Sequence, residues 1–175
     1  DVNSKMVPKV TIDPRLLFRL IIGGDFAKLR EKGFVARKGL SPIPITFPMI
    51  WRSKDSNVEF NLHAWRFLSA AWAYYIKNQN YQTAKEVFDF STAVAKDWIN
   101  FLKIKKSKYA WYDMAVGIRA MHIAFMKYLC SEYDAGKWEG ESLIDQLAEE
   151  HITWLSIQSN ITKGNHAIYQ IVGLR

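Results

Sequence analysis

The sequence contains one cysteine, Cys130, among its 175 residues. A single cysteine cannot close an internal disulfide, and it excludes a zinc site built from several cysteines. Long apolar runs are also lacking, so the sequence predicts no membrane-spanning helix. The chain begins at Asp1 with neither a methionine nor a signal-like apolar segment, and we therefore expect a processed or trimmed product.

Several enzyme signatures are absent as well. The chain has no Walker-type glycine loop, no Gly-x-Ser-x-Gly elbow and no dinucleotide-binding glycine fingerprint. These absences exclude kinases, P-loop enzymes, Rossmann dehydrogenases and hydrolases with that elbow. His63, His122 and His151 stand at unrelated positions without metal-site spacing, and we interpret them as structural histidines. The sequence thus predicts no metal and no cofactor.

The composition is that of one ordinary globular domain with an excess of positive charge. Hydrophobic residues make up 49% of the chain and charged residues 23%. The 24 lysines and arginines exceed the 17 acidic residues and give a net charge of +7. Such an excess favours an acidic partner, either nucleic acid, anionic lipid or an acidic polysaccharide. Because no nucleic-acid-binding motif accompanies the charge, nucleic acid is the least favoured of these.

The chain divides into an irregular first part and a helical second part. For residues 1–60 the sequence predicts an irregular segment that wraps across the surface of the helical part. It has short helices over 16–22 and 25–32 and an extended stretch over 41–48, where prolines exclude helix. Residues 61–175 carry apolar side chains at three- and four-residue intervals, which predicts helices over 62–76, 84–102, 114–129, 143–155 and 165–174. No strand-like alternation occurs. The sequence predicts an all-α fold of helical hairpins with short connections.

Two polar residues, Asn165 and His166, stand at the predicted start of the last helix. The free N–H groups at a helix start favour a nearby anion, so this pair is a candidate binding or catalytic site. Asn165 as a simple helix cap is the alternative.

A second candidate lies around Arg119, which interrupts an otherwise apolar helix. Such an arginine either pairs with a carboxylate, faces a polar cavity or extends to the surface. Upstream of it, the lysines of the 103–108 stretch precede Tyr109 and Trp111. These residues either hold phosphate or uronate groups or form a solvated loop. Three tryptophans on helical stripes, Trp65, Trp72 and Trp98, predict packing.

The order of these segments resembles the N-terminal helical domain of the heparinase II/III-like polysaccharide lyases. The segments that carry the resemblance are Pro44–Pro48 with Ile50-Trp51, Leu62–Leu68, Trp98-Ile99, Trp111–Arg119, and Gly164-Asn165-His166 heading an apolar helix. The resemblance covers most of residues 40–175 and implies an incomplete (α/α) toroid. It also implies β-elimination on a uronic-acid polysaccharide.

The resemblance also implies roles for particular residues. Asn165 would neutralise the uronate carboxylate, and His166 would be its partner or a base at the same site. Arg119 would pair with a substrate carboxylate or sulfate. Tyr169, by its place one helical turn beyond Asn165 and not by a family motif, and Trp111 are further candidates to line the cleft. An amide donates hydrogen bonds without titrating, and an imidazole changes charge near neutral pH, so both suit these tasks.

The family's catalytic tyrosine would lie downstream of Arg175, where the sequence ends. We therefore expect a fragment that is inactive alone and needs the remainder of its chain, or another subunit, to complete the toroid. The resemblance places the parent protein in the periplasm or outside the cell. The alternative function is a non-catalytic protein that binds or assembles acidic glycans on the same scaffold.

Overall fold

The computed structural model of the chain describes residues 23–133 and 138–174. Within these ranges the fold is all-α, with 67% of the residues helical and no β-strand. The all-α prediction is therefore confirmed. The predicted short helix over 16–22 lies outside the described residues.

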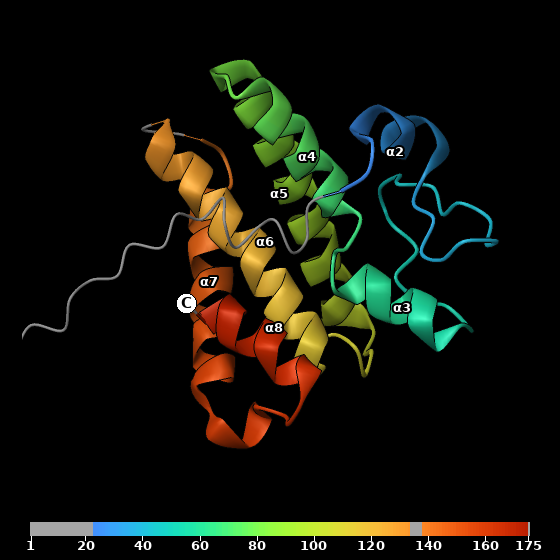
Figure 1. Ribbon diagram of the computed structural model, residues 1–175, viewed down its shortest axis with the longest axis vertical. Coiled ribbons are helices and arrows are strands. Elements are labelled where there is room, and N and C mark those ends of the chain that lie inside the picture. Colours follow the sequence, from blue (N-terminus) through green and yellow to red (C-terminus); the bar gives the residue numbers. More distant parts are fainter. Residues whose placement is uncertain (1–22, 134–137, 175) are drawn as a thin grey trace, which may run out of the picture.

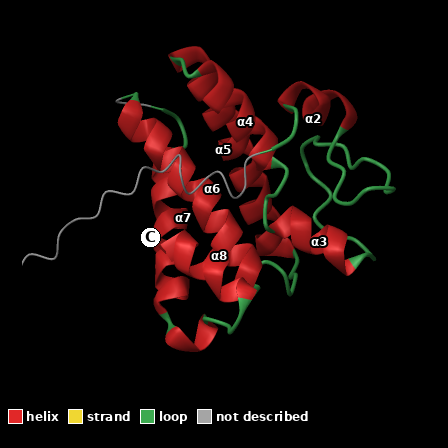
Figure 2. Cartoon of the chain, in the orientation of Figure 1, coloured by secondary structure: helices red, strands yellow, loops and turns green. Residues whose placement is uncertain are grey.

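The described part of the chain contains seven α-helices and one short 3₁₀ turn (Figures 1 and 2). They are α2 (Phe26–Lys32), α3 (Ser56–His63), α4 (Leu68–Asn78), α5 (Tyr81–Ile104), α6 (Asp113–Glu132), α7 (Glu141–Ser156), η1 (Gln158–Asn160) and α8 (Asn165–Leu174). α4 packs on α5, α6 packs on α7, and α8 lies across α6 and α7 (Figure 1). The core between them is rich in tryptophan, and Trp65, Trp72 and Trp98 are buried as predicted.

The segment before α3 is irregular, as the sequence predicts. α2 begins after Asp25, whose carboxylate accepts a hydrogen bond from the Lys28 amide. It is capped at its end by Gly33, which has a φ of +90°. A single antiparallel bridge joins Phe34 to Ile43, and the chain then runs extended to Trp51. Asp97 of α5 accepts hydrogen bonds from the Met49 amide and the Trp51 indole, so this wrap is fastened to the bundle.

One predicted helix is divided in two. The periodicity predicts a continuous helix over 62–76, but the chain turns at residues 64–67 and α4 begins at Leu68. Trp65 in this turn has a φ of +54°, which is unusual for a bulky residue. The turn places its indole edge-on against Trp98, 5.5 Å between ring centres, and over the side chain of Arg119. Tertiary packing of large rings here outweighs local helix propensity.

Candidate functional site

Two glycines let α8 lie almost backbone to backbone on α6. A Cβ atom at Gly117 would lie 2.5 Å from the carbonyl carbon and oxygen of Tyr169. A Cβ atom at Gly173 would lie 2.6 Å from the carbonyl oxygen of Gly117. No larger residue fits either position without moving one helix. This close approach fixes where the first residues of α8 lie.

Gly117→Ala is therefore expected to destabilise the protein by about 1–3 kcal/mol, because the new methyl group forces the two helices apart. Helix propensity alone predicts the opposite sign, since alanine is favoured over glycine by about 1 kcal/mol inside a helix. Urea unfolding and amide hydrogen exchange of α8 measure the effect. Gly23→Ala is the matched control, because no atom lies within 4 Å of a Cβ atom there. A rise in stability for Gly117→Ala would contradict this account of the α6–α8 contact.

The connection between α7 and α8 is held by one buried glutamine. The Gln170 side chain accepts hydrogen bonds from the Thr162 amide and hydroxyl and donates one to the Asn160 carbonyl, at 2.6–3.0 Å. Gln170 itself is fully buried. These bonds fold the connection back onto α8 and hold the helix start at a defined place.

His166 forms a dyad with Asp113 at this helix start. Its Nδ1 lies 3.0 Å from Oδ2 of Asp113, the first residue of α6. The other carboxylate oxygen of Asp113 accepts a hydrogen bond from the Met114 amide, which holds the carboxylate in one orientation. The His166 side chain is 35% exposed, and its Nε2 has no hydrogen-bond partner within the described ranges. A donor at Nδ1 leaves the Nε2 lone pair free, which is the arrangement of a histidine able to accept a proton.

Asn165 and Tyr169 flank this dyad on α8. Asn165 is exposed, and its side chain makes no hydrogen bond to any described residue. Tyr169 is half-buried, packs against the main core, and contributes the backbone that meets Gly117. The structure thus places Asn165 and His166 together at the surface, with Tyr169 one helical turn further along.

An aromatic surface adjoins His166. The Tyr112 ring lies edge-on to the His166 imidazole, with 6.5 Å between ring centres. Tyr112 also meets Phe60 and Tyr109, at 6.2 and 5.5 Å. Lys108 Nζ lies 4.9 Å from the centre of the Tyr109 ring, and Lys105, Lys106 and Lys108 are all exposed. A cationic and aromatic surface of this kind can bind an acidic sugar through both its charge and its apolar ring face.

Arg119, the predicted substrate-binding arginine, lies inside the protein. It is 0% exposed, and its guanidinium donates to His151 Nε2 and to the carbonyls of His63 and Ala110 at 2.6–2.8 Å. It belongs to none of the ion pairs among residues 23–133 and 138–174. Burial lowers the pKa of Arg119 to about 9, so it stays charged at neutral pH.

Three tryptophan rings surround that charge in place of a carboxylate. The Arg119 Cζ lies 4.3 Å from the centre of the Trp98 ring, 5.5 Å from Trp111 and 5.8 Å from Trp65. The negative face of an indole attracts a cation, most strongly where water is excluded. Arg119 therefore neither reaches the surface nor pairs with a carboxylate. It is a core residue, and a polysaccharide has no access to it.

Trp111 is the predicted binding residue that covers this cage from outside. It is 37% exposed, and its ring lies 5.2 Å from His151 and 6.3 Å from Trp154. Trp111 is therefore accessible to a ligand on one side and tied to Arg119 on the other.

Two residues of the site, Asp113 and Tyr112, were not predicted from the sequence. Asp113 lies 53 positions before His166, and no spacing pattern joins the two. The available signal was the Trp-Tyr-Asp run at a predicted helix start, which marks a cap as readily as a dyad.

The described residues contain no group of three or more histidine, cysteine, aspartate or glutamate side chains that could hold a metal ion. Among these described residues, no helix combines the length and the apolar character that a membrane crossing requires.

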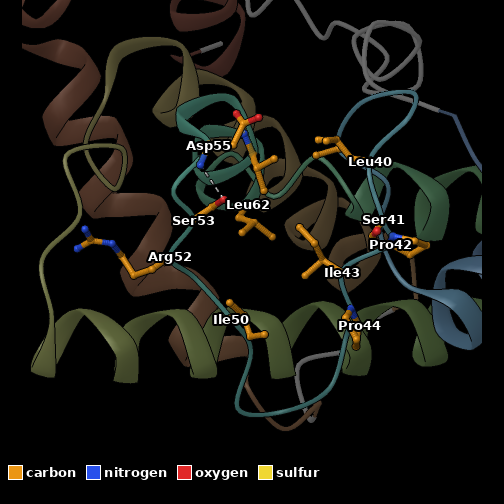
Figure 3. Close-up of a pocket in the computed structure, with 12 residues that line it drawn as sticks. Leu40, Ser41, Pro42, Ile43, Pro44, Ile50, Arg52, Ser53, Asp55 and Leu62 are labelled. Atoms are coloured by element: carbon orange, nitrogen blue, oxygen red, sulfur yellow. Dashed lines mark hydrogen bonds between the residues drawn. The ribbon is translucent and has the colours of Figure 1, made fainter.

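A pocket of about 480 Å³ lies elsewhere, between the 36–44 wrap and the start of α3 (Figure 3). Ile43, Ile50 and Leu62 point toward it, whereas Arg52 points away (Figure 3). Its charged neighbours are already engaged, since Arg52 contacts Glu59 and the Lys106 carbonyl and Asp55 caps α3. None of the residues that line it belongs to the α8 site.

Comparison of the chain with protein-family models, curated protein sequences and solved structures finds no match. The likeness to the polysaccharide lyases therefore rests on the sequence segments named for it.

Proposed function

We propose that this chain carries part of the site of a polysaccharide lyase that cleaves a uronic-acid polysaccharide by β-elimination. The observation that carries the proposal is the 3.0 Å contact between His166 Nδ1 and Asp113, beside Asn165 at an exposed helix start. The ordered sequence segments and the net charge of +7 support it.

The reaction requires removal of a proton from C5 of a uronate, next to a carboxylate that is already negative. Asn165 would donate hydrogen bonds to that carboxylate and lower its effective charge in the transition state. His166 Nε2 would accept the C5 proton, while Asp113 holds the ring and stabilises the imidazolium that forms. The electron pair of the broken C–H bond forms the C4–C5 double bond. The bond between C4 and the glycosidic oxygen breaks, and that oxygen leaves with the rest of the chain and takes up a proton from water.

The surroundings of the dyad suit a polyanionic sugar chain. Trp111, Tyr112 and Tyr169 would supply ring faces, and the exposed lysines of the 105–108 loop would attract the polymer. The fold proposal is an incomplete (α/α) toroid. Ile168, Ile171 and Leu174 leave 40–58% of their surface exposed on α8, which suits a further helix from the same chain or another subunit. Export to the periplasm or exterior belongs to the same proposal.

Asn165→Ala and His166→Gln are each expected to lower elimination activity of the full-length protein by about 10²–10⁴-fold. The ultraviolet absorbance of the new double bond measures the activity. Asn100→Ala, an exposed asparagine on α5, is the matched control and should retain full activity. Unchanged turnover in both α8 variants would remove this pair from the mechanism.

The second candidate is a glycan-binding or assembly protein without catalysis. The exposed lysines beside Tyr109 and the accessible Trp111 favour it, because they bind an acidic glycan without any proton transfer. Binding of a polysaccharide without an unsaturated product would support this candidate over the lyase.

A further inference from the structure

The positive charge of the chain is concentrated in two short segments, 41–54 and 98–112. Six of the 24 lysines and arginines lie there, and none of the 17 acidic residues does. The remaining 18 basic residues stand against all 17 acidic ones, so the rest of the chain is almost neutral. Nearly the whole net charge of +7 therefore comes from Arg52, Lys54, Lys103, Lys105, Lys106 and Lys108.

The two segments lie against each other on the side of the molecule that carries α3 (Figure 1). Arg52 donates a hydrogen bond to the Lys106 carbonyl at 2.8 Å. A hollow of about 320 Å³ lies between the segments, lined by Pro48, Met49 and Trp51 of the first and by Phe101, Ile104 and Lys105 of the second. Asp97 also lines the hollow, with its Oδ2 occupied by the Met49 amide and the Trp51 indole. The two charged segments therefore form one continuous surface.

Apolar side chains are exposed around this hollow. Ile104, the last residue of α5, has 82% of its surface exposed, the largest fraction among the exposed large hydrophobic side chains of the described residues. Pro48 lines the same hollow from the other segment and is also exposed, and Phe47 directly before it is 46% exposed. A single exposed apolar residue is ordinary, whereas adjoining ones rimmed by charge mark an interaction surface.

The lysines of this surface are not neutralised by neighbouring carboxylates. Lys103, Lys105, Lys106 and Lys108 are exposed, and none of them belongs to an ion pair within residues 23–133 and 138–174. A lysine in the last turn of a helix offsets the helix dipole, and this accounts for Lys103. The other three lie beyond the end of α5, where the dipole does not explain them.

Charge alone fits any polyanion, and the exposed Ile104 decides among them. A hydroxylated sugar chain or a nucleic-acid backbone gains little from an aliphatic side chain beside the lysines. A bilayer with anionic headgroups uses both features. Its negative surface attracts lysines, and apolar side chains enter the boundary between the headgroups and the acyl chains.

We propose that a basic face, formed by Pro48, Ile104 and the lysines of 103–108, docks on the surface of a bilayer that contains anionic lipid. Ile104 enters the boundary below the headgroups, and the ammonium groups of the lysines stay among the headgroups. The proposal does not depend on the lyase, which uses the His166–Asp113 dyad.

The test measures sedimentation of the full-length protein with two kinds of vesicle. One is phosphatidylcholine alone, and the other is phosphatidylcholine with about one-third phosphatidylserine. We expect at least about tenfold tighter binding to the mixed vesicles, and weaker binding as salt is added, because salt screens the charges. Equal binding to both kinds of vesicle, or binding to neither, would overturn the proposal.

Ile104→Ser removes the aliphatic side chain and leaves every charge in place. It should weaken binding to the mixed vesicles by about fivefold or more. Ile152→Ser, the same change at a 52% exposed isoleucine of α7, is the matched control and should bind as the unaltered protein does. Circular dichroism establishes that both variants are folded.

Lys105→Ala combined with Lys106→Ala should weaken the same binding by about tenfold or more. Lys77→Ala combined with Lys163→Ala is the control, because both lysines are exposed and lie outside the two charged segments. Unchanged vesicle binding after replacement of either Ile104 or the two loop lysines would overturn the proposal. If Ile104→Ser alone is without effect, the basic face is a site for a soluble polyanion and not for a bilayer.

Discussion

Arg119→Met is expected to lower the free energy of unfolding by at least about 3 kcal/mol. The substitution leaves three buried acceptors without a donor, namely His151 Nε2 and the carbonyls of His63 and Ala110. It also removes the cation at the centre of the Trp65, Trp98 and Trp111 rings. Those acceptors lie on α3, on α7 and in the loop before α6, so the loss loosens the junction of three segments.

Equilibrium unfolding in urea, followed by tryptophan fluorescence, measures this change. Arg37→Met is the control, because its exposed pair with Asp55 at 3.7 Å contributes at most about 1 kcal/mol. Arg119→Lys should recover little of the lost stability, since one ammonium cannot reach three acceptors arranged around a planar fork. A loss for Arg119→Met no larger than that of the control would show that the cage does not hold the junction together.

Acidification from pH 7 to pH 5 is expected to destabilise the protein strongly. His63, His122 and His151 are buried, and burial, followed by nearby arginine charges, lowers the pKa of each. The pKa is about 4 for His63 and about 3 for His122, against about 6.5 in an unfolded chain. Below pH 6.5 the unfolded state therefore binds protons that the folded state does not, and stability falls as the pH falls.

Each of these histidines contributes a slope of up to about 1.4 kcal/mol per pH unit between pH 6 and its folded pKa. Urea midpoints measured at half-unit steps from pH 7.5 to 4.5 give the total slope. His122→Gln removes one titrating group, so its slope should be smaller than that of the unaltered protein by about that amount. Constant stability from pH 7 to pH 5 would mean that these imidazoles are not held neutral in the fold.

The fold class and several elements were accessible from the sequence because local signals fix them. Asp25 caps the start of α2 and Gly33 caps its end, and the prolines of the 41–48 stretch keep that stretch extended. Asn165–Leu174 is helical as predicted. The break at residues 64–67 was not predictable, because no glycine or proline marks it. It follows from how Trp65 packs against α5 and α6, which only the tertiary structure defines.

The candidate site was predictable in part. Asn165 and His166 stand at a helix start that the sequence indicates, and Trp111 is accessible as a binding residue must be. The pairing of His166 with Asp113 depends on α8 lying on α6, which depends in turn on Gly117. The resemblance assigned Arg119 to substrate, whereas its acceptors in the fold are a histidine and two carbonyls far apart in sequence.

The ultraviolet assay of the folded full-length protein against a panel of acidic polysaccharides tests the lyase proposal most directly. We expect rising absorbance with at least one uronic-acid polymer, and a loss of about 10²-fold or more when His166 is replaced by glutamine. A flat trace with every polymer would contradict the lyase. Binding of a polymer under the same conditions would then assign the surface around Tyr112 and Lys108 to glycan binding, and the His166–Asp113 pair to the packing of α8.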